Sequence, residues 1–209
     1  MNGAAGSPPI DHIVFDIGGV LIHWDPEIPY RDLIADEARR RWFLSEVCSP
    51  QWNVEQDRGR SWAEAEAELI GRFPAEEKLI RAFRERWPEM IPHALEESVV
   101  VLEGLVAQGR DVTLLTNFND ETFAEARARY RFLDLARGAT VSALVGLLKP
   151  EREIFDHHAQ TFGLDAGASL FIDDNQANVD GARAAGWQAV QFVDAARLRA
   201  DLADFGIAA

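Results

Sequence analysis

Apolar residues recur along the chain in two rhythms, and each rhythm predicts a different kind of element. Short apolar runs rich in β-branched and aromatic residues, bounded by polar residues or glycine, are typical of buried strands. Such runs predict strands over residues 12–17, 111–117, 139–146, 169–174 and 187–193, where the range 139–146 includes the residues that lead out of the strand. Apolar residues at helical spacing alternate with these runs after residue 93. They predict helices over residues 94–109, 119–130, 151–163, 175–186 and 195–205.

Helices of this length between successive strands favour a parallel sheet with right-handed crossovers, so the predicted fold class is α/β. The segment over residues 26–93 has a different texture, with apolar residues at helical spacing among many charges and no strand pattern. We therefore expect a helical cap over residues 26–93, inserted into an α/β core of residues 10–25 and 94–209. Ligands bind at the carboxyl ends of parallel strands, so a cap inserted after the first strand is placed to act as a lid.

Within this insertion, the spacing predicts three amphipathic helices, punctuated by prolines. They cover residues 31–47, 61–73 and 76–87.

Composition narrows the classes of partner and location. The net charge of −14 disfavours nucleic acid and anionic membranes as partners, and no apolar run approaches the roughly 20 residues of a membrane span. The single cysteine, Cys48, excludes an internal disulfide and fits a cytoplasmic protein. Residues 1–9 lack the features of a secretory signal and are expected to form a disordered arm. A monomer or a homodimer is expected.

Polar side chains follow three of the predicted strands, and an ammonium lies in a loop between two of them. Because parallel strands end at one edge of the sheet, these side chains are expected to converge there. They are Asp16 after the first strand, Thr116 and Asn117 after the second, Asp173 and Asp174 after the fourth, and Lys149 before the helix at 151–163.

This set of groups suits phosphoryl transfer. Three carboxylates repel one another unless a cation lies between them, and oxygen ligands without His or Cys suit Mg²⁺. The Gly18 carbonyl is placed to supply a further ligand. The lone carboxylate of Asp16 is a candidate nucleophile, because a carboxylate can attack phosphorus and form an aspartyl phosphate. Gly18 and Gly19 lack side chains, so their backbone N–H groups can approach a phosphate closely.

Four motifs in this order resemble the haloacid dehalogenase superfamily, whose members are mostly phosphatases. The motifs are FDIGGVL with Asp16, LLTN with Thr116, LLKP with Lys149, and FIDDNQANVDGARAAG with Asp173 and Asp174. The resemblance covers nearly the whole chain after residue 10 and implies a Rossmann-like core with a small helical cap. Three stretches are most similar to phosphatases of glucose 1-phosphate, namely FDIGGV, EQDRGRSWAEAEAEL and FIDDNQANVDGA.

The resemblance also implies a role for each matched residue. Asp16 is expected to be the nucleophile and Lys149 the catalytic cation. The phosphate is expected to bind Thr116, Asn117, Gly19 and Lys149, and Mg²⁺ to bind Asp16, Gly18, Asp173 and Asp174.

One position departs from the family pattern. Most phosphatases of the superfamily have, two residues after the nucleophile, an Asp that protonates the leaving oxygen and later activates water, and this chain has Gly18 there. General acid–base help contributes about 10²–10⁴-fold. Two explanations stay open: a leaving group that needs little protonation, such as an anomeric hydroxyl, or an acid elsewhere. The candidate acids are His23, Asp25, Glu55 and Asp57.

Three functions remain open from the sequence. The first is a Mg²⁺-dependent phosphomonoesterase of a small sugar phosphate. The second is a 2-haloacid dehalogenase in which Asp16 displaces halide, although dehalogenases of this superfamily do not keep the paired acids that Asp173 and Asp174 provide. The third is a phosphate-ligand binding protein without turnover. Trp24 and Trp52 are the tryptophans expected to face a substrate, and His158 is expected to be structural.

Overall fold

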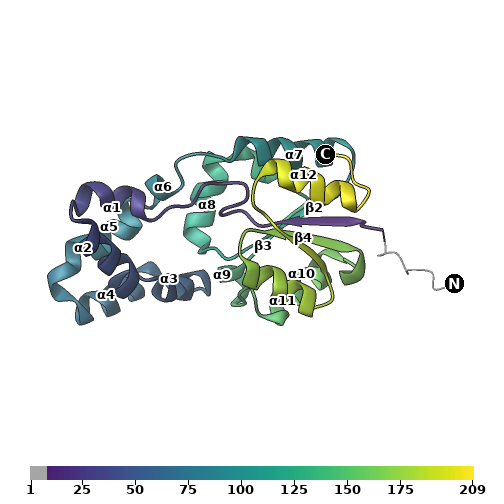
Figure 1. Ribbon diagram of the computed structural model, residues 1–209. Coiled ribbons are helices and arrows are strands. Elements are labelled where there is room, and N and C mark those ends of the chain that lie inside the picture. Colours follow the sequence, from purple (N-terminus) through teal and green to yellow (C-terminus); the bar gives the residue numbers. More distant parts are fainter. Residues whose placement is uncertain (1–8) are drawn as a thin grey trace.

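The core is a five-stranded parallel sheet with the strand order β3-β2-β1-β4-β5 (Figure 1). The computed structural model describes residues 9–209, so the predicted arm lies outside the described residues except for Pro9. The predicted parallel α/β fold is confirmed. The strands are β1 (His12–Phe15), β2 (Asp111–Thr116), β3 (Ala139–Val141), β4 (Ser169–Asp173) and β5 (Gln188–Gln191).

Helices cover both faces of this sheet, as Figure 1 shows. Helices α7 (Glu96–Ala107) and α12 (Ala195–Asp204) lie on one face, and α10 (Arg152–Phe162) and α11 (Gln176–Ala184) lie on the other. Side chains of β1 alternate between the two faces of the sheet. Ile13 and Phe15 belong to the apolar cluster that includes residues of α7 and α12, whereas Val14 belongs to the cluster with residues of α10 and α11. Because both faces are covered, β1 is apolar from Ile13 to Phe15, as buried parallel strands are.

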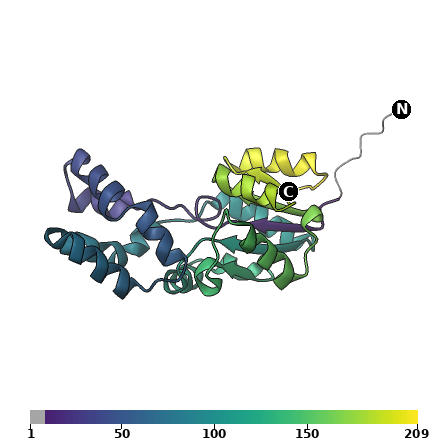
Figure 2. The same cartoon turned by 90° about the horizontal axis from the view of Figure 1, so that it is seen from below.

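The chain between β1 and β2 leaves the sheet and forms a helical insertion, residues 27–90. Figures 1 and 2 show its helices gathered beyond the end of the sheet. The two connecting segments run side by side, with His23 N–H donating to His93 O (3.1 Å) and Leu95 N–H to Leu21 O (2.8 Å). The α-helices of the insertion are α1 (Glu27–Leu33), α2 (Glu37–Trp42), α3 (Pro50–Asp57), α4 (Trp62–Arg72), α5 (Glu77–Glu85) and α6 (Trp87–Met90).

Smaller elements complete the chain. In the core these are α8 (Asp120–Arg129), the 3₁₀ turns Arg131–Leu135 and Ala166–Ala168, and α9 (Ser142–Val145). The insertion also contains a π-helical turn at Phe43–Val47 and a 3₁₀ turn at Pro74–Glu76. Within residues 9–209, no helix is both long enough and apolar enough to cross a membrane.

The insertion differs from the prediction in two places. The single helix predicted over residues 31–47 is wrong, because α1 ends at Leu33 and Asp36 caps a new helix by accepting from Arg39 N–H at 2.7 Å. Helix α3 was not predicted. Its start carries the expected signals, since Ser49 caps it and Pro50 occupies the first helical position. The observed strand β3 is also shorter than the strand predicted over residues 139–146, because α9 begins at the fourth residue of that range.

The buried histidine of α10 ties that helix to the sheet. The ring of His158 hydrogen-bonds to Thr113 Oγ1 on β2 (2.9 Å) and to Thr140 Oγ1 on β3 (2.8 Å), and the residue has no exposed surface. Burial lowers the pKa of His158 to about 3, and the nearby charges of His157 and Arg137 act in the same direction.

We expect this histidine to make stability depend on pH. Between about pH 6.5 and pH 3 the unfolded chain binds a proton at His158 and the folded chain does not. This term of the unfolding free energy therefore falls by up to about 1.4 kcal/mol per pH unit as the pH drops through that window. Urea titrations at several pH values should show that the free energy of unfolding falls less steeply with decreasing pH for His158→Gln than for the wild type. The partly exposed His157→Gln should follow the wild type, and parallel losses in all three proteins would contradict this assignment.

Candidate active site

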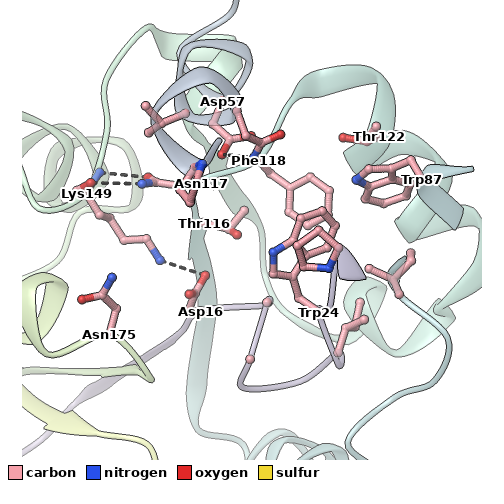
Figure 3. Close-up of a pocket in the computed structure, with 18 of the residues that line it drawn as sticks. Asp16, Trp24, Asp57, Trp87, Thr116, Asn117, Phe118, Thr122, Lys149 and Asn175 are labelled. Atoms are coloured by element: carbon pink, nitrogen blue, oxygen red, sulfur yellow. Dashed lines mark hydrogen bonds and ion pairs between the residues drawn. The ribbon is translucent and has the colours of Figure 1, made fainter. Parts of the chain in front are cut away.

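The carboxyl ends of the three central strands bring the predicted polar groups together. Asp16 follows β1, Thr116 ends β2 and Asp173 ends β4, and β1 lies between the other two strands. The register aligns Phe15 with Leu114 on β2 and with Ile172 on β4. These strand ends form the floor of a cavity of about 420 Å³ between the sheet and the helical insertion, drawn in Figure 3.

Lys149 is the cation of this cavity. Its Nζ lies 2.8 Å from Asp16 Oδ1, 2.7 Å from Asp173 Oδ2 and 3.1 Å from the Leu115 carbonyl oxygen, so its three N–H groups all have acceptors. Burial alone would lower the pKa of Lys149, but the two carboxylates raise it above its ordinary value. Lys149 is therefore an ammonium held between two acids.

Asp16 is almost completely buried and still reaches the cavity. Burial raises its pKa, and so does the charge of Asp173, while Lys149 lowers it. A carboxylate under these opposing influences favours a further cation at its open side, because that cation would stabilise the charged form.

The two acids of the fourth motif have different surroundings. Asp173 is fully buried and accepts hydrogen bonds from Asn178 Nδ2 (3.0 Å to each oxygen) and Asn175 N–H (2.8 Å), in addition to Lys149. Asp174 lines the cavity, and burial raises its pKa. Asp173 thus orients Lys149 from behind, while Asp174 faces the ligand space. Asn178 is a residue that the sequence analysis did not identify, and only the fold shows that it holds Asp173.

The two glycines after Asp16 are not equivalent. Gly19 has a φ of +75°, and a Cβ there would lie 2.3 Å from Asp174 Oδ2, so no other residue fits. Its N–H donates to Ile22 O at 2.9 Å, so this donor already has a partner, and the expected contact of Gly19 with phosphate stays a prediction. At Gly18 a Cβ would meet only the Trp24 Cβ at 4.0 Å, so a side chain has room.

The side chain of Asn117 has partners on the Lys149 loop. Its side-chain Nδ2 donates to the Lys149 carbonyl oxygen (3.0 Å), and its Oδ1 accepts from the Lys149 N–H (2.9 Å), as the dashed lines of Figure 3 show. The side-chain amide thus holds the Lys149 loop, and the expected contact of Asn117 with phosphate stays a prediction. Thr116 lies between Asn117 and Asp16 in Figure 3 and lines the cavity.

The acid cluster fits a magnesium ion. One oxygen from each of Asp16, Asp173 and Asp174 lies within 4.8 Å of the other two. Gly18 borders the same cavity, and its carbonyl oxygen accepts no hydrogen bond within residues 9–209. Such a donor set contains only hard oxygens, which suits Mg²⁺ better than zinc or copper. Because the oxygens of Asp173 are already hydrogen-bonded, the open ligands are those of Asp16, Asp174 and Gly18.

A family model for haloacid dehalogenase-like hydrolases matches residues 10–186. The chain belongs to this family. It is 27% identical over 184 residues to a sesquiterpene phosphatase of Aspergillus oryzae, covering 87% of this chain and 89% of the relative. It is 29% identical over 194 residues to a phosphatase of Mycobacterium tuberculosis, with 86% of each chain covered.

Solved structures of the family share the fold. A predicted hydrolase of this family from Porphyromonas gingivalis superposes with a TM-score of 0.73 at 26% identity, covering 90% of this chain and 93% of that one. A family enzyme of Bacteroides thetaiotaomicron, crystallised with magnesium and inorganic phosphate, superposes with a TM-score of 0.68 at 24% identity, covering 88% and 95%.

In this haloacid dehalogenase-like hydrolase, one of the four candidate acids reaches the cavity. Asp57, at the end of α3, lines it. His23 stacks on His93 with the ring centroids 4.9 Å apart and borders a different hollow. Asp25 is engaged with Glu27 N–H (2.8 Å) and Arg31 (3.0 Å), and Glu55 is exposed.

Most of the cavity lining that the helical insertion contributes is apolar, although Ser49, Asn53 and Asp57 also line it. Figure 3 shows Trp24, Trp87 and Phe118 grouped on the side away from Lys149. Trp24 therefore faces the ligand space as expected, whereas Trp52 is buried inside the insertion, with its Nε1 donating to Ala65 O at 3.4 Å. The apolar lining also includes Leu44, Val54, Trp62, Phe83 and Ile91.

Proposed function

We propose that this hydrolase is a Mg²⁺-dependent phosphomonoesterase that works through an aspartyl phosphate on Asp16. The observation that carries the proposal is the position of Asp16: a buried carboxylate at a central strand end, beside Lys149 and open to a cavity that Asp174 and the Gly18 carbonyl also border. Two relatives named as phosphatases, each aligned over more than four fifths of the chain, support it.

The residues divide the work as follows. Lys149 fixes one oxygen of Asp16 and adds positive charge beside the phosphoryl group, and Thr116 offers a hydroxyl donor at the same edge. Asp16 attacks phosphorus, and the alcohol leaves as the aspartyl phosphate forms. Water then attacks the same phosphorus, releasing inorganic phosphate and the free carboxylate. Mg²⁺, held by Asp16, Asp174 and the Gly18 carbonyl, would offset charge on the phosphoryl oxygens when bound.

We infer that the alcohol portion of the substrate is largely apolar. A sugar exposes many hydroxyls, and each would lose water without a partner against the tryptophans and Phe118. An aliphatic or prenyl chain gains about 0.8 kcal/mol for each buried CH₂ at such a surface. The relative named for a sesquiterpene substrate is in keeping with this choice.

A sugar phosphate such as glucose 1-phosphate stays the second candidate. Asn53, Asp57 and Thr122 line the same cavity and could bind hydroxyls. Dehalogenase activity has less support, because displacement of halide by Asp16 needs no metal, whereas the clustered carboxylates of Asp16, Asp173 and Asp174 favour a bound cation.

A substrate panel tests the proposal. Phosphate release should be measured from farnesyl phosphate, glucose 1-phosphate, glucose 6-phosphate and p-nitrophenyl phosphate, each with Mg²⁺ and with EDTA. Chelation is expected to lower the rates by at least about 100-fold, since it removes several kcal/mol of charge stabilisation. We expect kcat/KM for farnesyl phosphate to exceed that for glucose 1-phosphate by about 10–100-fold.

Each outcome of the panel has a distinct meaning. No Mg²⁺-dependent release from any ester would contradict the phosphatase proposal, and preference for glucose 1-phosphate would replace the apolar substrate with the sugar. Chloride release from 2-chloropropionate in EDTA would favour the dehalogenase.

A further inference from the structure

The position that carries the second acid in most phosphatases of the family is vacant here, although it is not sterically closed. Gly18 has no left-handed backbone, and a Cβ there would have only an ordinary contact with Trp24 at 4.0 Å. The chain therefore does not need glycine at this position for its fold. A proton donor placed on another element would leave the position free for glycine.

Asp57 is the carboxyl group of the helical insertion that reaches the same cavity. It is the last residue of α3, and in Figure 3 it lies on the far side of Thr116 from Asp16. Asp16, Gly18 and Asp57 all line one cavity, so an ester bound at Asp16 would extend from the strand ends toward the insertion, past Asp57.

The core holds Asp57 in this position. Ser142 Oγ donates to the Asp57 carbonyl oxygen (2.5 Å) and accepts from Phe118 N–H (2.9 Å). Asn53 Nδ2 lies 3.4 Å from the Asp57 Oδ2, and the backbone N–H of Asn119 lowers the pKa of this carboxyl group. The start of α9 thus fixes the backbone of Asp57 against the core, which limits where its side chain can lie, as a positioned catalytic group requires.

The neighbouring residue strengthens the same junction. Arg58 pairs with Glu151, with Nη2 2.5 Å from Oε1, and Glu151 lies two residues after Lys149. Asp57 is therefore tied on both sides to the loops that carry Phe118 and Lys149.

The protonation of Asp57 suits proton transfer near neutral pH. Burial raises the pKa of Asp57 to about 7, against the lowering by the Asn119 N–H and by the positive charge of Lys149. Both the acid and its conjugate base are then populated, which is the condition for efficient general acid–base catalysis.

We propose that Asp57 is a catalytic residue that supplies, from the helical insertion, the proton donor and acceptor absent at Gly18. This inference rests on the phosphatase proposal above. In the first step the Asp57 carboxyl proton passes to the ester oxygen as the P–O bond breaks and the Asp16–phosphorus bond forms, releasing a neutral alcohol. In the second step the Asp57 carboxylate takes a proton from the attacking water, inorganic phosphate leaves Asp16, and both side chains regain their starting forms.

The test compares Asp57→Asn with Glu55→Gln, an exposed acid of the same helix, on two esters. Butyl phosphate has a leaving group that needs a proton, whereas p-nitrophenolate leaves without one. For Asp57→Asn we expect kcat on butyl phosphate to fall by about 10²–10⁴-fold. On p-nitrophenyl phosphate we expect a burst of p-nitrophenolate, up to one equivalent per enzyme, and then slow turnover. Glu55→Gln should keep wild-type values.

A second carboxylate at the vacant position provides a rescue. The double variant with Gly18→Asp and Asp57→Asn is expected to have a kcat at least about tenfold above that of Asp57→Asn alone, because a Cβ at position 18 meets no close contact. Thermal melting confirms that each variant is folded.

Two results would overturn the assignment. One is a kcat for Asp57→Asn within about threefold of Glu55→Gln on both esters, and the other is a loss confined to KM. The failure of the phosphatase proposal looks different: the wild-type protein would then show no Mg²⁺-dependent hydrolysis of either ester, and both proposals would fall.

Discussion

Asp16→Asn is expected to lower phosphate release by about 10⁴-fold or more while stabilising the metal-free protein. The amide cannot attack phosphorus, so the aspartyl phosphate cannot form. The substitution also removes one of three clustered negative charges that share the single Lys149 cation. Because burial already disfavours the Asp16 carboxylate, the neutral amide should raise the free energy of unfolding by about 1 kcal/mol.

The test measures both phosphate release and the free energy of unfolding. Urea unfolding should be followed in EDTA and in Mg²⁺, with Asp11→Asn as the matched control, because Asp11 precedes β1 and is exposed where Asp16 follows β1 and is buried. Mg²⁺ is expected to stabilise the wild type and the control more than Asp16→Asn, since the variant loses a ligand. A variant that keeps a tenth of the wild-type activity, or that gains as much from Mg²⁺, would contradict the assignment of Asp16.

The core and the acid edge of the sheet were predictable because they depend on short-range pattern. Strands such as residues 12–15 are apolar on both faces, and a parallel sheet then requires their ends to meet. Asp16, Thr116 and Asp173 come together for that reason alone. No side-chain geometry was needed to place them at one edge.

The roles of Asn117 and Gly19 were not predictable in the same way. Both lie where the pattern puts a phosphate-binding group, but the Asn117 amide holds the Lys149 backbone and the Gly19 N–H closes a turn with Ile22. Sequence places a residue at a strand end and leaves open which neighbour its polar atoms choose. For Asn117 the chosen neighbour lies 32 residues away along the chain, whereas for Gly19 it lies in the same turn.

The helical insertion was the harder part, for two physical reasons. Helix α3 has start signals at Ser49 and Pro50, yet it shows almost no amphipathic pattern from which a helix could be predicted. Its aromatic residues also look alike in sequence: Trp52 is inside the insertion and Trp62 borders the cavity, although both are nearly buried. Only the docking of the insertion on the core separates Asp57, at the cavity, from Glu55, two residues earlier and exposed.

Lys149→Met is expected to have the opposite effect on stability from Asp16→Asn. Methionine keeps most of the buried side-chain volume but removes the ammonium that lies within 2.8 Å of two buried carboxylate oxygens. Leaving a buried charge without its partner costs about 3–5 kcal/mol. We expect activity to fall as well, by at least about 10²-fold, because a fixed positive charge beside the phosphoryl group is lost.

The exposed Lys78 of α5 is the other lysine of the chain, and Lys78→Met is the matched control, with no expected change in activity. Urea unfolding in EDTA and in Mg²⁺ separates charge from packing. Mg²⁺ should recover more stability in Lys149→Met than in the wild type, since an added cation partly replaces the missing one. Equal recovery would indicate lost packing instead. Asp16→Asn should raise the free energy of unfolding and Lys149→Met should lower it. These opposite changes are expected only if Lys149 is the counter-ion that allows the three carboxylates to be buried together.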